Sequence, residues 1–195
     1  MSICLYQGTF NPIHKIHLEV AKFAKEYYNF DKIIFIPAYM PPHKTVDKTL
    51  ATHRFNMVKL AIKNIPFFNI SDIEYKFRGN SYTYNTIVKL KNDMNIDNKI
   101  NFIIGTDAFE KIESWYKTNE LKELVHFIIF PRTNSFNKSD FNHLKEKGYD
   151  FEFAPMKYKD VSSTQIRRNL RNGESIKGLE IPQVMEYIKE NDLYK

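Results

Sequence analysis

Several common features are scarce in this chain of 195 residues, and each scarcity excludes a class of protein. A single cysteine, Cys4, excludes an internal disulfide and leaves no thiolate zinc cluster to consider. No apolar run approaches the ~18 residues that a membrane span needs. The N-terminus also lacks a basic segment followed by a long apolar one, as a secretory signal would have. We therefore expect a cytoplasmic protein with no membrane partner.

Charge of one sign is not concentrated in the sequence either. Lysine and arginine outnumber aspartate and glutamate by 29 to 23, which gives a net charge of +6 and favours anionic ligands in general. The lysines are scattered, and no arginine-rich patch is interleaved with aromatic residues, so we expect no nucleic-acid partner. The length suits one well-cored domain over residues 1–195, and no repeat or Gly/Ser linker divides it. No pattern in the sequence indicates an oligomeric state.

Short apolar runs alternate with amphipathic stretches along the chain. The nearly continuous hydrophobicity of the runs is typical of strands that are covered on both faces, as in a parallel sheet. The expected strands are residues 3–6, 33–36, 67–70, 100–104, 125–130 and a weaker 151–153. This alternation predicts an α/β fold with a doubly wound, mostly parallel sheet and a ligand at the carboxyl ends of its strands.

The stretches between the strands have the spacing of amphipathic helices. The first expected helix covers residues 18–28, with its start at or near His14, and the last covers about 182–191. The second and third have apolar stripes at Met57, Leu60, Ala61 and Ile65 and at Tyr84, Ile87, Val88 and Leu90. Residues 37–49 and 134–140 are expected to form loops.

The segment 8–17 joins the first strand to the first helix and is the most informative part of the sequence. Gly8 lets backbone approach a ligand closely, since it has no Cβ. His14 and His17 are one helical turn apart, so their imidazoles share a face. The helix N-terminus adds free N–H groups and a partial positive charge. The pattern favours phosphate binding, and a packed or solvated helical histidine is the alternative interpretation.

Two more segments follow expected strands. Pro41-Pro42-His43-Lys44 presents a histidine and a lysine on a stiff loop, which is also typical of an exposed turn. Gly105-Thr106-Asp107 precedes Trp115-Tyr116, so a carboxylate could reach a ribose or a hydrated metal while the indole stacks on a flat heterocycle. A helix cap at Asp107 and a core tryptophan are the alternatives.

The segment 161–168 completes the set of candidate sites. Ser162 or Ser163 would cap a helix whose free N–H groups face outward, and Arg167 lies one turn further on with a bidentate fork for the same anion. No serine–histidine–aspartate order, close carboxylate pair or cysteine nucleophile competes with this set. Donors and cations of this kind stabilise charge on a transferring phosphoryl or nucleotidyl group, largely by positioning it.

Taken together, these motifs resemble a known superfamily. Residues 8–17 with Ser162-Ser163-Thr164 and Arg167 resemble the nucleotidyltransferases that carry an HxGH-type and an SxTxxR-type motif. Residues 41–44, 81–83, 105–107 and 115–116 make the chain similar to the bacterial nicotinate-nucleotide adenylyltransferases, in order through nearly its whole length. The resemblance implies a Rossmann-like nucleotidyltransferase fold in one domain, 1–195, whose C-terminal part, about 161–195, completes the ATP site.

The resemblance also implies a reaction and a set of roles. The implied activity is adenylyl transfer from ATP to nicotinate mononucleotide, giving deamido-NAD and pyrophosphate in NAD biosynthesis, with Mg²⁺ held through the ATP phosphates and by no direct protein ligand. The implied catalytic residues are His14, His17 and Arg167. The implied ATP-binding residues are Gly8, Thr9, Phe10, His14, His17, Gly105, Asp107, Ser163, Thr164 and Arg167. The implied mononucleotide-binding residues are His43, Lys44, Thr83, Trp115 and Tyr116.

Two positions depart from the family pattern. Gln7 stands where the family usually has the first glycine of a pair, and Ile16 stands where it usually has a small residue before the second histidine. We expect the β-branched Ile16 to press on the adenine pocket. The alternatives are a sibling adenylyltransferase acting on nicotinamide mononucleotide or phosphopantetheine, and a nucleotide-binding regulatory protein without turnover, which Ile16 would favour.

Overall fold

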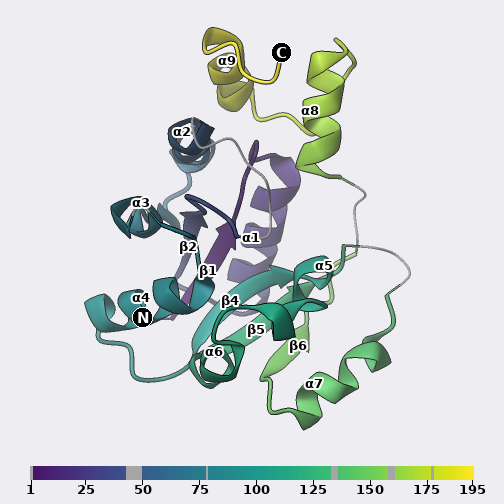
Figure 1. The fold of residues 1–195 in the computed structure, drawn as a ribbon. Helices are drawn as coiled ribbons and strands as arrows, with labels where there is room; N and C mark the ends of the chain where they lie inside the picture. Colours follow the sequence, from purple (N-terminus) through teal and green to yellow (C-terminus); the bar gives the residue numbers. More distant parts are fainter. Residues whose placement is uncertain (1, 43–49, 78, 133–135, 158–160, 177) are drawn as a thin grey trace.

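The computed structural model describes residues 2–42, 50–77, 79–132, 136–157, 161–176 and 178–195. Over these ranges one six-stranded sheet has the order β3-β2-β1-β4-β5-β6, and every neighbouring pair is parallel (Figure 1). This order confirms the predicted doubly wound α/β sheet. The strands are β1 (Ile3–Gly8), β2 (Lys32–Pro37), β3 (Phe68–Ile70), β4 (Ile100–Gly105), β5 (Val125–Phe130) and β6 (Phe151–Phe153).

Helices connect the strands and extend the chain beyond the sheet. They are α1 (Lys15–Tyr27), α2 (Leu50–Ile62), α3 (Ile73–Phe77), α4 (Thr83–Met94), α5 (Thr106–Phe109), α6 (Thr118–Leu124), α7 (Asn142–Glu146), α8 (Ser163–Arg171) and α9 (Pro182–Glu190), with 3₁₀ turns η1 (Ile112–Ser114) and η2 (Lys138–Phe141). None of the helices in the described ranges is long and apolar enough to cross a membrane.

Two local predictions were wrong. Ile65 lies beyond the end of α2, because it precedes Pro66 and a residue before proline is forced out of the helical region. The predicted polar loop 134–140 contains the start of η2 in its described part. Asn137 caps that turn by accepting from the Ser139 backbone N–H at 3.1 Å, and Phe141 at its end is buried. A cap and a buried aromatic ring are enough to order this short segment.

The alternation of side chains along the strands divides the core into two clusters. Cys4 and Tyr6 of β1 lie on the face covered by α1, α2 and α9. Ile3 and Leu5 lie on the opposite face, where α3, α4, α5, α6 and α7 pack. Because both faces are buried, the strands carry the continuous apolar runs seen in the sequence.

The fold brings several chain segments to one edge of the sheet. β1 lies between β2 and β4, which is the point where the strand order reverses and where open α/β sheets bind ligands at their carboxyl ends. α8 and α9 lie beyond that end of β1 (Figure 1). α9 is joined to α2 through Tyr187, whose hydroxyl lies 2.9 Å from His53 Nδ1 and accepts from Asn56 Nδ2 at 2.9 Å.

Candidate active site

The turn between β1 and α1 is shaped by Gly8 and Phe10. A Cβ on Gly8 would lie 2.9 Å from Phe10 Cζ, which is closer than real carbon contacts allow. Phe10 is 2% exposed and has a left-handed backbone with φ of 47°. The missing Cβ thus makes room for the Phe10 ring, whereas the sequence suggested that it makes room for a ligand.

His14 and His17 lie face to face at the start of α1. Their ring centroids are 3.8 Å apart, as the one-turn spacing predicted. The backbone N–H of His14, the N-cap residue, donates to His17 Nδ1 at 3.2 Å, so this ring nitrogen acts as an acceptor. The Phe10 ring packs edge-on against His17 at 5.1 Å and holds that imidazole in place.

His14 is buried but not satisfied. It is 2% exposed, and neither ring nitrogen has a hydrogen-bond partner within the described ranges. Burial, with a further contribution from the positive charge of Arg132, lowers the pKa of His14 to about 3, so the imidazole is neutral at pH 7. A buried polar group without a partner costs about 1–3 kcal/mol, and such a group is often completed by a ligand.

The N-terminus of α8 meets the turn that follows β1. Ser162 caps α8 by accepting from the Gln165 backbone N–H at 3.2 Å, as predicted. Ser163 Oγ donates to the Pro12 carbonyl at 3.0 Å, and Arg167 Nη1 donates to the Asn11 carbonyl at 2.8 Å. The two motifs that are most distant in the sequence are therefore joined directly.

Thr164 and Tyr194 extend this junction. Arg167 Nη2 lies 3.3 Å from Thr164 Oγ1, to which it donates. The Tyr194 hydroxyl donates to the Asn11 side-chain oxygen and is buried. The turn after β1 is thus held by side chains from both ends of the C-terminal part of the chain.

At the corner between β4 and α5 the side chains of Asp107 and Arg132 occupy the space beside Gly105. A Cβ there would lie 2.5 Å from Asp107 Oδ1 and 2.9 Å from Arg132 side-chain atoms. Asp107 Oδ1 is 3.9 Å from Arg132 Nε, and Thr106 Oγ1 accepts from the Arg132 backbone N–H at 2.9 Å. The N-cap of α5 is Gly105, so the alternative interpretation of Asp107 as the cap was wrong.

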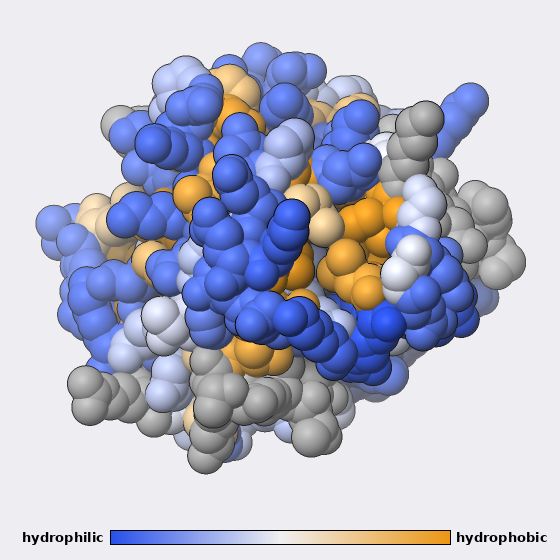
Figure 2. All heavy atoms as spheres, turned by 90° about the horizontal axis from the view of Figure 1, so that it is seen from above, coloured by the Kyte–Doolittle hydropathy of each residue, from blue (hydrophilic) through white to orange (hydrophobic). Residues whose placement is uncertain are grey.

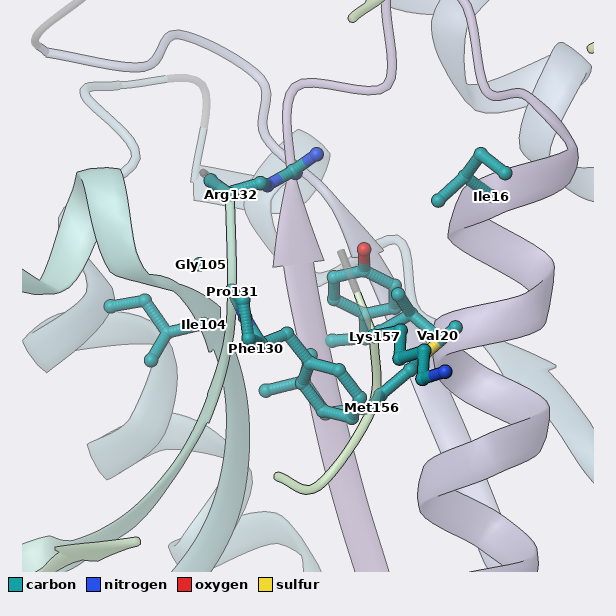
Figure 3. A pocket seen from close by; sticks show the side chains of 11 residues that line it. Ile16, Val20, Ile104, Gly105, Phe130, Pro131, Arg132, Met156 and Lys157 are labelled. Carbon is teal, nitrogen blue, oxygen red and sulfur yellow. The ribbon is translucent and has the colours of Figure 1, made fainter. Parts of the chain in front are cut away.

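A cleft opens between α1 and the ends of β4 and β5 (Figure 3). Figure 3 shows Ile16 and Val20 on one side of it and Gly105 and Arg132 on the other. From above, apolar side chains are visible in a hollow between polar ones (Figure 2). The cleft is lined by Tyr6, Ile16, Val20, Ile103, Ile104, Gly105, Phe130, Pro131, Arg132, Met156 and Lys157. Ile16 therefore does form part of a pocket wall.

A second group of predicted site residues lies around the start of α4. Thr83 is buried, and its Oγ1 donates to Gln7 Oε1 at 2.7 Å. Trp115 is half-buried and packs against the core cluster of the α3–α7 face, so part of it serves the core. Tyr116 is 44% exposed, and its ring centroid lies 4.6 Å from that of Tyr82. The predicted residues His43 and Lys44 lie outside the described residues.

Two arginines at this edge were missed by the sequence analysis. Arg54 of α2 is fully buried and donates to the carbonyls of Thr9 at 3.0 Å, Tyr39 at 2.9 Å, and Ala38. No pattern in the sequence of a helix indicates that one of its arginines will be buried and bonded to backbone carbonyls. Arg132 lies two residues beyond the end of β5, and a cation near the carboxyl end of a strand is a signal that the sequence does contain. Burial lowers the pKa of Arg54.

No set of three histidine, cysteine, aspartate or glutamate side chains in the described residues is arranged to hold a metal ion. The groups described at the carboxyl edge include imidazoles, guanidiniums, hydroxyls and backbone N–H groups, with the Asp107 carboxylate beside Arg132. The donors and cations among them are ligands for phosphate oxygens.

Comparison with known proteins identifies the family. The cytidylyltransferase-like family model matches residues 5–169. Two relatives carry the name "Probable nicotinate-nucleotide adenylyltransferase". The one from Caldicellulosiruptor saccharolyticus is 38% identical and covers 100% of both chains. The one from Staphylococcus haemolyticus is 37% identical and covers 100% of this chain and 97% of its own.

Solved structures share the fold. A Plasmodium falciparum nicotinic acid mononucleotide adenylyltransferase complexed with NaAD has a TM-score of 0.81 at 22% identity, over 99% of this chain and 97% of that chain. The same enzyme complexed with APC has a TM-score of 0.78 at 21% identity, over 99% and 96%. With 37 to 38% identity to relatives over its full length, the chain belongs to the nicotinate-nucleotide adenylyltransferase family, within the cytidylyltransferase-like group.

Proposed function

We propose that the protein transfers the adenylyl group of ATP to nicotinate mononucleotide, which gives deamido-NAD and pyrophosphate in NAD biosynthesis. Membership of the family supports this activity. The observation that carries the proposal is the unsatisfied, buried His14 beside His17, in a turn that Ser163 and Arg167 also contact. Cations and hydrogen-bond donors converge there, and no nucleophilic side chain is needed for the reaction.

The reaction joins a phosphate oxygen of the mononucleotide to the α-phosphorus of ATP and breaks the bond to pyrophosphate. His14 and His17 contact the reacting phosphates, and the backbone of Gly8, Thr9 and Phe10 lines them. His14 is neutral before ATP binds, so it offers a hydrogen bond, and the fixed positive charge comes from the arginines near it. Such preorganised donors stabilise the charge that develops in the transition state.

The two substrates occupy the two sides of this turn. On the ATP side, Ser163, Thr164 and Arg167 bind the β- and γ-phosphates, and the cleft beside Ile16 takes the adenosine. Gly105 and Asp107 line that cleft at the end of β4. On the other side, the mononucleotide is bound by His43, Lys44, Thr83, Trp115 and Tyr116, with Trp115 stacked on the pyridine ring.

Mg²⁺ enters with the phosphates of ATP and is held by them. When bound, it neutralises charge on the triphosphate and on the leaving pyrophosphate. The donor set of the turn fits a phosphate-bound ion, because its imidazoles, guanidiniums and hydroxyls contact phosphate oxygens and leave the ion to those oxygens. Residues 161–195 complete the ATP site of a single domain, 1–195, and the protein acts in the cytoplasm without a nucleic-acid partner.

Pyrophosphate release tests the activity directly. The protein is incubated with ATP and Mg²⁺ and with nicotinate mononucleotide, nicotinamide mononucleotide or phosphopantetheine in turn. We expect the highest kcat/KM with nicotinate mononucleotide. A higher value with either other acceptor would show a sibling adenylyltransferase. ATP binding without release of pyrophosphate from ATP in the presence of any of these acceptors would show a regulatory protein.

Substitutions of single residues test which side of the site binds ATP and which binds the mononucleotide. His17→Ala should abolish turnover in protein that remains folded by circular dichroism, and near-normal rates would refute its role. Trp115→Ala should chiefly raise the KM for the mononucleotide. An effect of Trp115→Ala confined to ATP would reverse the assignment of the two pockets.

A further inference from the structure

Gln7 occupies a position that none of the roles above uses. It is half-buried near the carboxyl end of β1, directly before Gly8, and its side-chain amide contacts two neighbouring helices.

The Gln7 amide joins three elements of the fold. Its Nε2 donates to Glu74 Oε1 of α3. Its Oε1 accepts from Thr83 Oγ1, the first residue of α4, at 2.7 Å. β1, α3 and α4 are thereby connected through one planar group, at the edge of the sheet where the mononucleotide side of the site lies.

Glu74 determines the orientation of the Gln7 side-chain amide. Its carboxylate is 2% exposed and accepts from Thr86 Oγ1 at 2.9 Å and from the Tyr39 backbone N–H at 3.1 Å. Because a carboxylate only accepts, the NH₂ side of the Gln7 amide must face Glu74. The carbonyl side then faces Thr83. Donation runs in one direction, from Thr83 to Gln7 to Glu74, and it fixes the position of the Thr83 hydroxyl.

We propose that Gln7 is a positioning residue for the mononucleotide site, which holds Thr83 and the first turn of α4 against the end of β1. This inference rests on the proposed function, because the mononucleotide is the ligand that Thr83 meets. Gln7 itself lies behind Thr83 and acts through it. A change at Gln7 should therefore weaken binding of the mononucleotide and leave binding of ATP unchanged.

The first test replaces Gln7 by leucine, which keeps the approximate size and removes both hydrogen bonds. We expect Gln7→Leu to raise the KM for nicotinate mononucleotide about tenfold, with the KM for ATP and kcat changed less than about twofold. Gln183→Leu, at an exposed position of α9, is the matched control and should change none of these constants. Calorimetric titration with nicotinate mononucleotide measures the same loss independently of turnover.

A second variant, Gln7→Glu, has nearly the same shape and makes the arrangement depend on pH. When ionised, Glu at position 7 accepts from Thr83 but repels Glu74. When protonated, it can donate to Glu74 as the amide does. Adjacent carboxyl groups raise the pKa of one of the pair. Within the described residues, the groups whose charges act on Glu74 and its neighbours are Arg54 from α2 and Tyr39 and Tyr75, and burial raises the pKa of Tyr75 to about 12.

The KM of Gln7→Glu for the mononucleotide should consequently fall at least about fivefold, relative to wild type, from pH 8 to pH 6. Gln7→Leu should show no such recovery. A merely structural role for Gln7 would change the constants for both substrates together and give no pH-dependent recovery in Gln7→Glu, and either result would overturn the inference. Failure of the proposed function is a separate result, in which wild type neither turns over nor binds the mononucleotide.

Discussion

Single side chains set the electrostatics of the site. His14 is buried, neutral and without a hydrogen-bond partner in the described structure, while Arg132 contributes positive charge beside it. Arg54, also buried, gives its hydrogen bonds to backbone carbonyls that follow β1 and β2. Positive charge around a neutral imidazole favours the binding of an anionic ligand. The same charge disfavours protonation of the imidazole.

The depressed pKa of His14 predicts a stability that falls in acid. The pKa is about 3 in the folded protein and about 6.5 in the unfolded chain, so the unfolded state binds the proton first as the pH falls. The contribution of neutral His14 to the free energy of unfolding is fully present above pH 6.5 and is progressively lost as the pH falls toward 3. Between pH 7 and pH 5, urea unfolding of wild type should lose about 2 kcal/mol more than that of His14→Gln. Equal losses in the two proteins would contradict the burial of His14.

At the scale of elements, the site depends on how helices begin. The N-cap of α1 is His14, that of α8 is Ser162, and the first residue of α4, Thr83, is bonded to Gln7 near the carboxyl end of β1. A helix start supplies free N–H groups and positive potential, but only while its first turn is intact.

Loss of the α8 cap should weaken both the helix and the ATP site. Ser162→Ala removes the acceptor for the Gln165 N–H and should lower the free energy of unfolding by about 1 kcal/mol. Because Ser163 and Arg167 lie in the frayed turns, the KM for ATP should rise while that for the mononucleotide stays constant. Ser162→Thr restores a capping hydroxyl and serves as the control. If Ser162→Ala is destabilised but its KM for ATP is unchanged, α8 does not contribute to ATP binding.

Much of this element arrangement could be predicted from the sequence. Strands such as 125–130 are short, nearly continuous apolar runs between helical stretches, and the serine cap of α8 has a local signal. The Gln7–Thr83 bond could not be predicted, because it joins residues 76 positions apart that carry no shared pattern. The packing of the Phe10 ring against Gly8 also could not be predicted, since a glycine beside an aromatic ring and a glycine beside a ligand look the same in the sequence.

At the scale of the whole molecule, the C-terminal part of the chain packs against its N-terminal part. α9 packs on α2 through Tyr187, and Tyr194 reaches Asn11 in the turn after β1. The turn after β1 is therefore held in part by a residue near the C-terminal end of the sequence, Tyr194.

Tyr194→Phe should show what this long-range contact contributes. Removing the hydroxyl leaves the ring in place but frees the Asn11 side chain, so we expect about 1 kcal/mol less stability and a severalfold lower kcat/KM for ATP. Tyr27→Phe, at a position that is 57% exposed, is the matched control. Steady-state kinetics with ATP varied at saturating mononucleotide measures the effect. Identical kinetic constants in Tyr194→Phe and Tyr27→Phe would show that the contact between Tyr194 and Asn11 does not position the turn after β1.

The fate of the α-phosphate of ATP tests the central claim most directly. ATP labelled at the α-phosphorus is incubated with nicotinate mononucleotide and Mg²⁺, and the products are separated. The adenylyl-transfer reaction predicts that the label appears in a dinucleotide, that pyrophosphate is unlabelled, and that His17→Ala forms neither product. Label in AMP alone, release of the γ-phosphate as a monophosphate, or full activity of His17→Ala would contradict it.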